Sequence, residues 1–141
     1  MRAEAAAQHR SMFEAHGDEY GPQIAGLVTA GLAIQHRELE LAQRARGAFR
    51  DAVAPWLSRF DALLSPVAPG TAPRRGEGTG DPTLCAPWSY VGLPAISIPT
   101  GLDDEGLPFA LQLVGGADGL ERLLGSAAWC ERVVAFDARP P

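Results

Sequence analysis

The sequence predicts an α/β chain in which several helices pack on part of a β-sheet. Three observations favour this class. The first 60 residues have the composition and the apolar spacing of helices. Short apolar runs at residues 61–65, 95–98 and 109–114 are typical of buried strands. A helical pattern returns after Asp118 and continues toward the end of the sequence. The length of 141 residues fits one ordinary domain with its own core.

Three helices are expected in the first part of the chain. Residues 3–16 are rich in Ala and Glu, which are good helix formers. Residues 22–33 begin with a proline, which suits the first turn of a helix. Residues 34–57 carry apolar side chains mostly three or four positions apart. Within the second helix, Gly26 and Gly31 are destabilising unless they let another backbone approach closely.

A β-hairpin is expected in the second part. Residues 95–98 and 109–114 are the two strands, and residues 100–108 form a short, polar, Gly-containing connection. Such a connection joins adjacent antiparallel strands, whereas a parallel crossover needs a dozen residues or more. Residues 61–65 form an earlier strand. Residues 66–82 have the Pro- and Gly-rich composition of a loop, and a loop this long is usually functional or mobile.

The last helix is expected to begin at Asp118, whose side chain can cap the free N–H groups of the first turn. Glu121 stands at the third helical position, which gives a capping-box-like pattern. Cys130 lies within this helix, among leucines and alanines with helical spacing. We therefore expect Cys130 to be packed inside the protein.

The bulk composition argues against several classes of protein. The net charge of −5 and the absence of a basic stripe argue against a nucleic-acid-binding module. The longest apolar stretch, residues 24–34, is too short to span a membrane, which needs about 20 residues. No targeting signal is visible. Cys85 and Cys130 are expected to be reduced thiols, and the protein is expected to be cytoplasmic.

The sequence contains none of the common catalytic motifs. No serine lies in a Gly-x-Ser-x-Gly or Gly-Ser-Ser-Gly pattern, and no phosphate-binding loop is present. The acidic run at residues 103–105 is expected to be a solvated hairpin tip rather than a metal site. We therefore predict no metal site and no cofactor. A Cys–His enzyme stays an alternative, because such partners need to meet only in space.

Four motifs in a fixed order resemble the C-terminal block of amidase-signature enzymes. The most specific is Gly92-Leu93-Pro94-Ala95, followed by an apolar strand that ends in Pro99-Thr100-Gly101. The others are an apolar strand with a Pro-rich loop (residues 61–69), a strand that contains Gln112 (residues 106–115), and a terminal helix with Glu121, Leu123, Leu124 and Glu131. The resemblance covers nearly the whole chain. It implies that residues 1–141 are the C-terminal portion of an amidase-signature domain, with residues 1–60 helical.

The resemblance also implies a function. Enzymes of this family hydrolyse carboxamide C–N bonds with a Ser nucleophile, a second Ser and a Lys base. These residues belong to the N-terminal and central parts of a much longer chain. In this sequence all 12 basic residues are Arg, and Arg cannot act as a base because it stays protonated. We therefore assign no catalytic residue and expect the chain alone to be inactive.

The expected role of the chain is to complete a larger enzyme. Its helices would pack on part of a mixed β-sheet whose other strands come from the missing N-terminal portion. Its partner would be that portion, or other copies in a homo-oligomer, and a small amide substrate would bind only in the complete enzyme. A stand-alone, non-catalytic binding or interaction module is the alternative from another class. A chain that does not fold alone is a third.

A substrate-binding role is implied for the segment before the Gly-Leu-Pro motif. This segment contains Leu84, Cys85, Trp88 and Ser89, and two roles stay open for them: a wall of the substrate pocket, or core packing behind the strand. Gln112 is expected to satisfy backbone polar groups rather than to touch substrate. Gly92 is expected to serve turn geometry.

Overall fold

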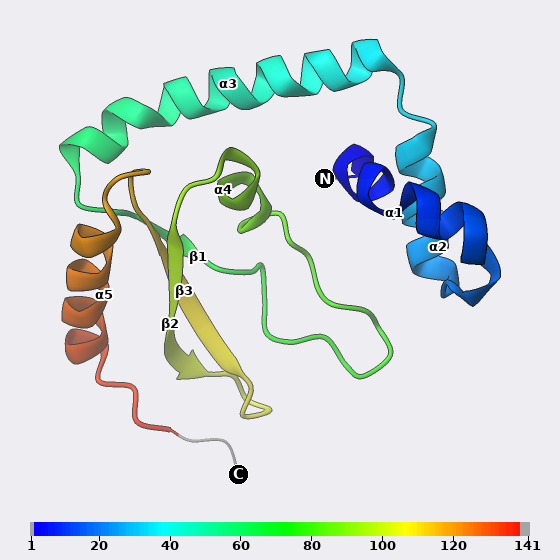
Figure 1. Cartoon of the computed structure of the whole chain (residues 1–141). Helices are drawn as coiled ribbons and strands as arrows, with labels where there is room; N and C mark the ends of the chain where they lie inside the picture. Colours follow the sequence, from blue (N-terminus) through cyan, green and yellow to red (C-terminus); the bar gives the residue numbers. More distant parts are fainter. Residues whose placement is uncertain (1, 139–141) are drawn as a thin grey trace. The chain divides into compact units, whose positions relative to one another are not determined.

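The computed structural model describes residues 2–138. The chain divides into two compact units, Met1–Ala48 and Phe49–Pro141, and each is described by itself (Figure 1). The helix α3 (His36–Arg59) begins in the first unit and ends in the second. Within the described part of the chain, no helix is long and apolar enough to cross a membrane.

The first unit is helical, as predicted. It contains α1 (Arg2–His16), a 3₁₀ turn η1 (Gly17–Glu19) and α2 (Pro22–Leu32) before α3 begins. Each helix lies within two residues of its predicted bounds. The start of α3 shifts to His36, after the backbone of Ala33 and Ile34 has closed a turn onto Thr29 and Gly31.

The helices α1 and α2 touch at Gly31. A Cβ atom built on Gly31 would lie 2.3 Å from the Arg2 carbonyl oxygen and 2.6 Å from the Cβ of Ala6. Gly31 therefore permits a close backbone approach, the condition under which a glycine in this helix was not expected to be destabilising. Gly26 has no such neighbour, since nothing lies within 4 Å of its ideal Cβ position. Ala6 and Val28 are buried in the same unit.

The second unit is built on a three-stranded antiparallel sheet. Its strands are β1 (Leu63–Pro66), β2 (Ala95–Leu102) and β3 (Pro108–Val114), in the order β1-β3-β2. The predicted hairpin of β2 and β3 is confirmed. β2 is longer than predicted, because pairing continues beyond an irregularity between Pro99 and Gly101. The predicted class, helices packed on part of a sheet, is confirmed as well, and the described strands all pair antiparallel.

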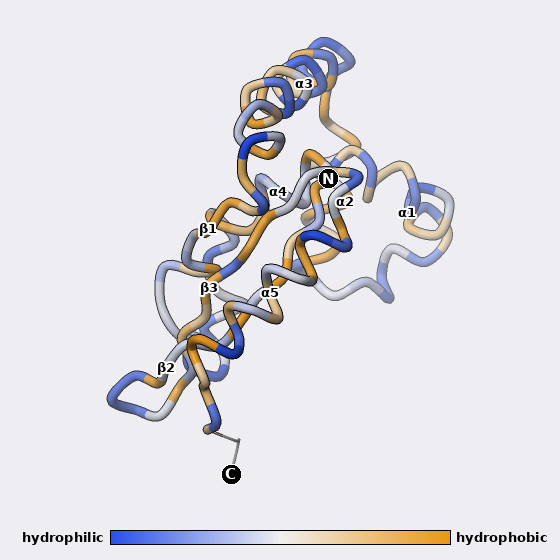
Figure 2. The backbone as a smooth tube through the Cα atoms, turned by 90° about the vertical axis from the view of Figure 1, so that its left-hand side faces the viewer, coloured by the Kyte–Doolittle hydropathy of each residue, from blue (hydrophilic) through white to orange (hydrophobic). Residues whose placement is uncertain are grey.

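Residues on the two faces of the sheet pack against different elements, and on one face Ala95, Ser97 and Pro99 of β2 stay exposed. The helix α5 (Leu120–Val134) lies along one face, with a core of Ile98, Leu113, Leu123 and Ala127 (Figure 1). On the other face, the end of α3 and the short helix α4 (Ala86–Val91) enclose Leu57, Val91, Leu93 and Val114. Figure 2 shows hydrophobic residues along β1 and β3, whereas α3 alternates between hydrophobic and hydrophilic positions.

Two local expectations differ from the structure. Asp118 is not the N-cap of α5, because Gly119 occupies that position and no side chain caps the helix. The Gly119 N–H instead donates to the Gly116 carbonyl at 2.9 Å, and this turn delays the first helical residue to Leu120. The helix α4 was not predicted at all. The expected turn role of Gly92 is confirmed, since it ends α4 in the left-handed conformation, with φ of 72°.

Candidate functional site

The four predicted pocket residues lie together at the start of α4. Leu84 precedes the helix, Cys85 is its N-cap, and Trp88 and Ser89 lie inside it. The N–H groups of Cys85 and Ala86 both donate to the Pro82 carbonyl, at 3.1 and 2.8 Å, so the chain turns sharply as it enters α4. The structure therefore brings the four residues together, and their role in a substrate pocket stays a prediction.

Trp88 is the member of this group that packs against a core cluster. Its ring contacts the core cluster of Leu57, Val91, Leu93 and Val114. Its centroid lies 5.7 Å from that of Phe49. The indole nitrogen Nε1 is buried and has no hydrogen-bond partner within residues 2–138. A buried donor without a partner costs about 1–3 kcal/mol, so this ring is held in place by packing rather than by polar contacts.

Of the other three residues, only Ser89 is exposed. Leu84 and Cys85 are half-buried, and Ser89 is exposed. The Cys85 thiol donates to the Pro82 carbonyl at 3.4 Å, and both cysteines are free thiols. Cys130 is half-buried beside the α5 cluster, in agreement with its predicted packing. The segment thus presents a polar, accessible side while Trp88 anchors the other side in the core.

Gln112 joins this segment to the sheet. It lies in the middle of β3, is only 2% exposed, and places Nε2 2.7 Å from the Leu84 carbonyl oxygen. The same nitrogen lies 3.2 Å from the Pro66 carbonyl and 3.1 Å from Oγ of Ser65. The prediction that Gln112 satisfies backbone groups is confirmed. Its partner Leu84, at the edge of the candidate site, was not foreseen.

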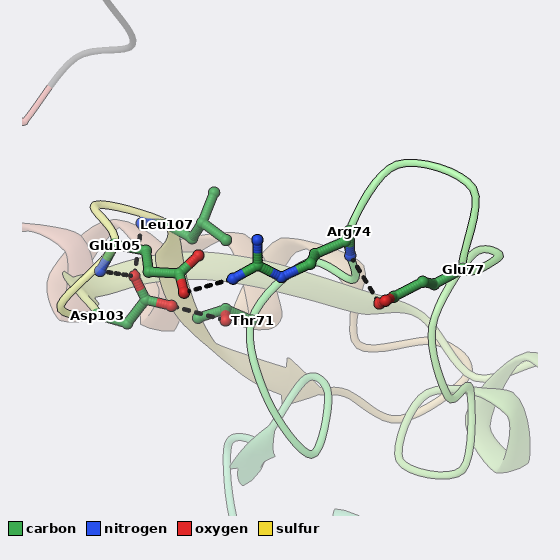
Figure 3. Close-up of polar contacts among 6 residues, drawn as sticks. All are labelled: Thr71, Arg74, Glu77, Asp103, Glu105 and Leu107. Atoms are coloured by element: carbon green, nitrogen blue, oxygen red, sulfur yellow. Dashed lines mark hydrogen bonds and ion pairs between the residues drawn. The ribbon is translucent and has the colours of Figure 1, made fainter.

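The loop that leads into the candidate site is fastened to the hairpin tip. Thr71 donates to Oδ2 of Asp103 at 2.7 Å, and Arg74 pairs with Glu105 at 2.9 Å (Figure 3). Oδ1 of Asp103 accepts the N–H groups of Glu105 and Leu107. The hydrogen bond from Thr71, followed by that from the Leu107 N–H, lowers the pKa of Asp103 below its ordinary value. The acidic run is therefore an ordered turn that holds the loop.

The described side chains form no cluster of metal ligands, and one serine lines an open depression. Within residues 2–138, no group of three or more His, Cys, Asp or Glu side chains could hold a metal ion. An open depression of about 440 Å³ lies between the end of α3 and the start of α5, and Ser58 lines it. The Ser58 hydroxyl donates to the Pro55 carbonyl at 2.9 Å, so this contact does not activate it as a nucleophile.

The three histidines have polar contacts with neighbouring side chains. His9 contacts the Tyr20 hydroxyl at 2.8 Å, His16 contacts Glu19 at 3.2 Å, and His36 contacts Glu40 at 3.3 Å. Each of these partners lies within the first unit, whereas both cysteines belong to the second.

Comparison with known proteins identifies the family. The model of the amidase family matches residues 6–124, which is most of the chain. The chain belongs to the amidase family. Its curated relatives in this family include a glutamyl-tRNA(Gln) amidotransferase subunit from Parvibaculum lavamentivorans. That relative is 39% identical over 106 residues, which are 70% of this chain and 22% of the relative. The corresponding subunit from Granulibacter bethesdensis is 38% identical and is covered to 21%.

Solved amidase-family structures have the same fold. A crystal structure described as an amidase superposes with a TM-score of 0.85 at 31% identity, over 94% of this chain and 33% of that one. A 6-aminohexanoate cyclic dimer hydrolase superposes with a TM-score of 0.78 at 23% identity, which shows likeness of fold alone. It is matched over 99% of this chain and 34% of its own. The chain thus spans about a fifth of these curated relatives and about a third of these solved structures.

Two features of the candidate site had readable signals in the sequence. The helix α4 has Pro87 near its start and Gly92 just after its end. A proline and a glycine at these positions are typical start and stop signals of a helix, so they could have indicated α4. A buried strand with one polar residue, Gln112, indicated an internal hydrogen bond. Which backbone group Gln112 would meet had no signal, because Leu84 lies 28 residues away.

Proposed function

We propose that this chain is the C-terminal part of an amidase-type hydrolase, in which it contributes sheet and pocket wall to the hydrolysis of a carboxamide C–N bond. The observation that carries the proposal is the superposition of 94% of the chain on one third of a solved amidase. The three-stranded sheet and the helices packed on it therefore fit a segment of a larger sheet. Leu84, Cys85, Trp88 and Ser89 are proposed to face a small amide substrate only in the complete enzyme.

The catalytic groups are proposed to come from another part of that enzyme. Acyl transfer by a serine needs a neighbouring base to take the hydroxyl proton. The sequence contains no Lys, and its Arg side chains stay protonated at any working pH. The proposed location is the cytoplasm, which agrees with two half-buried cysteines that are free thiols.

The purified chain is expected to show no turnover of simple aliphatic or aromatic amides. A chimera should be active: the 31%-identical solved amidase, with its matching segment replaced by this chain, should regain hydrolysis of its own amide substrate. The reason is that the recipient supplies the Ser and Lys groups while the chain supplies sheet and pocket wall. Turnover is measured by release of ammonia or amine from the amide, with the unmodified recipient as the control.

Two results would contradict this proposal. The first is turnover by the chain alone that disappears when one of its own residues is replaced. The second is a folded chimera that binds no amide, which would show that the chain does not build the pocket. A recipient that simply lacks the segment serves as the matched negative control.

An apolar groove supports the proposal of a docking surface for the rest of the enzyme. The groove lies between α5 and the sheet and has a volume of about 160 Å³. Three of its lining residues are large and exposed: Leu64 at 59%, Trp129 at 58% and Val133 at 63%. The outer edges of β1 and β2 carry no strand partner within residues 2–138. We propose that the remaining amidase portion covers this groove, and that copies of the chain associate through it when that portion is absent.

Self-association is therefore expected at micromolar concentration. Sedimentation equilibrium should show an oligomer, and the double variant Trp129→Gln with Val133→Gln should shift it toward monomer. The shift follows because burial of apolar surface contributes roughly 25 cal/mol per Å². The control variant is Ala128→Gln, on the same helix at an exposed position outside the groove. A stable wild-type monomer with cooperative unfolding would contradict this expectation and favour a stand-alone binding module.

A further inference from the structure

Gln112 has an unusual position among the described residues. Within residues 2–138 it is the one buried polar side chain, and it occupies the central strand of the sheet. Its cross-strand neighbours are Ser65 on β1 and Ser97 on β2. Its amide points to the face that α4 covers, since it reaches Leu84 at the entry to that helix. A buried amide in a strand centre is tolerated only if its hydrogen bonds are made.

The three contacts of Gln112 tie together segments that are distant in the sequence. Nε2 lies 2.7 Å from the Leu84 carbonyl, 3.2 Å from the Pro66 carbonyl and 3.1 Å from Oγ of Ser65. An amide NH₂ group has two protons, so these acceptors share them. The Leu84 contact is the shortest. Pro66 begins the loop of residues 66–82 and Leu84 lies two residues after its end, so Gln112 joins the two sides of the loop at its base.

We propose that Gln112 is a positioning residue, which holds the segment Leu84–Ser89 against the sheet through the donated hydrogen bond to the Leu84 carbonyl. We call this hydrogen bond and its effect on the segment the clamp, and it follows from these contacts alone. Its value for substrate binding rests on the proposed function, in which Leu84–Ser89 forms the pocket wall. The indole nitrogen of Trp88 has no hydrogen-bond partner within residues 2–138. The Leu84 bond links the start of α4 to the sheet, whereas the hydrogen bonds of Cys85 and Ala86 to Pro82 stay within the segment itself.

Two substitutions of similar size distinguish a hydrogen-bonding role of Gln112 from a role in packing alone. Gln112→Met keeps the length of the side chain but removes both donors. Gln112→Glu keeps the shape but places a carboxylate against two carbonyl oxygens. Protonation of that Glu restores one donor, so the hydrogen bond can form again. Because burial raises the pKa of a carboxyl group, this protonation occurs at an acidic pH that the experiment can reach. A packing role alone predicts no such recovery at low pH.

The experiment measures hydrogen exchange of the three indole N–H groups of the full chain by NMR. Trp88 is the reporter, and Trp56 and Trp129, both more than half exposed, are references in the same sample. We expect Gln112→Met to speed Trp88 exchange, relative to the references, by roughly tenfold, the factor that corresponds to about 1.4 kcal/mol. Gln112→Glu should do the same at neutral pH and recover toward wild type as the pH falls. Ser97→Ala, in the same row of the sheet, should change nothing.

Several results would overturn the clamp. One is an unchanged Trp88 ratio in Gln112→Met while circular dichroism shows an intact fold. Another is identical behaviour of the Met and Glu variants at every pH, which would indicate packing. Global unfolding of both variants at every pH would also overturn it, because Gln112 would then support the whole sheet rather than one segment.

The chimeric amidase tests the consequence for substrate binding. There, Gln112→Met should raise KM more than it lowers kcat, because a loosened pocket wall weakens substrate binding before it disturbs the reacting groups. The exchange measurement does not depend on amide turnover. A positive exchange result with an inactive chimera would therefore reject the proposed function and leave the clamp intact.

Discussion

Replacement of Gly31 by alanine is expected to lower the free energy of unfolding of the helical first unit by about 1–3 kcal/mol, the usual cost of overpacking. The added Cβ would lie 2.3 Å from the Arg2 carbonyl oxygen and 2.6 Å from the Cβ of Ala6. One of these neighbours is backbone, so it cannot turn aside as a flexible side chain could. The helices α1 and α2 would have to separate, which loosens the buried contacts of Ala6 and Val28.

Gly26→Ala is the matched control for this prediction. It makes the same chemical change in the same helix, and nothing lies within 4 Å of the new atom. Because alanine favours a helix interior over glycine by roughly 0.5–1 kcal/mol, Gly26→Ala should stabilise the unit. Urea unfolding followed by circular dichroism measures both. If Gly31→Ala proved as stable as Gly26→Ala, the close packing of α1 on α2 would be wrong.

Leu123→Ala is expected to cost more, about 2–5 kcal/mol of unfolding free energy in the second unit. Leu123 is only 1% exposed and belongs to the cluster that joins α5 to the sheet. It also packs on Gly115, since a Cβ atom there would lie 3.1 Å from the Cβ of Leu123. Truncation would leave a cavity that the rigid strand β3 cannot fill.

The neighbouring residue provides the comparison. Leu124 is 50% exposed on the same helix, so Leu124→Ala makes the same helix-propensity change with little loss of burial. Its effect should stay within about 0.5 kcal/mol, as for ordinary surface substitutions. Guanidinium unfolding followed by circular dichroism gives both values. Equal losses for the two variants would mean that α5 does not present Leu123 to the sheet.

Most of the helices and strands could be predicted from the sequence, because the patterns that indicate them are local. Repeated apolar spacing indicated α1, α2, α3 and α5, and a short polar connection between two apolar runs indicated the β2–β3 hairpin. The helix α4 was not predicted, because its six residues make fewer than two turns and are too few to show a helical periodicity. The cap of α5 was assigned to Asp118 because its side chain suits that role, but a backbone turn at Gly116 and Gly119 decides the start instead.

The candidate site was predictable only as a group of neighbours. Cys85, Trp88 and Ser89 are adjacent in the sequence, so any fold would keep them together. What fixes their surroundings is long-range: the contact of Trp88 with Phe49 and the bond from Gln112 to Leu84. Such contacts depend on how the strands and helices meet, and a single sequence holds no local pattern for that.

The strand order β1-β3-β2 determines the order in which the strands can pair during synthesis. Among the three described strands, β3 comes last in the sequence and lies in the middle in space, so β1 finds no partner among them until β3, up to Val114, has left the ribosome. Until then β1 stays unpaired and the long loop after it stays open, because the loop closes only when β1 pairs with the distant strand β3. The hairpin can form first, and β1 then joins it as α5 is being made. During synthesis, the apolar residues of β1 are therefore exposed for longer than those of the other two strands, and a chaperone that binds nascent chains would find its target there.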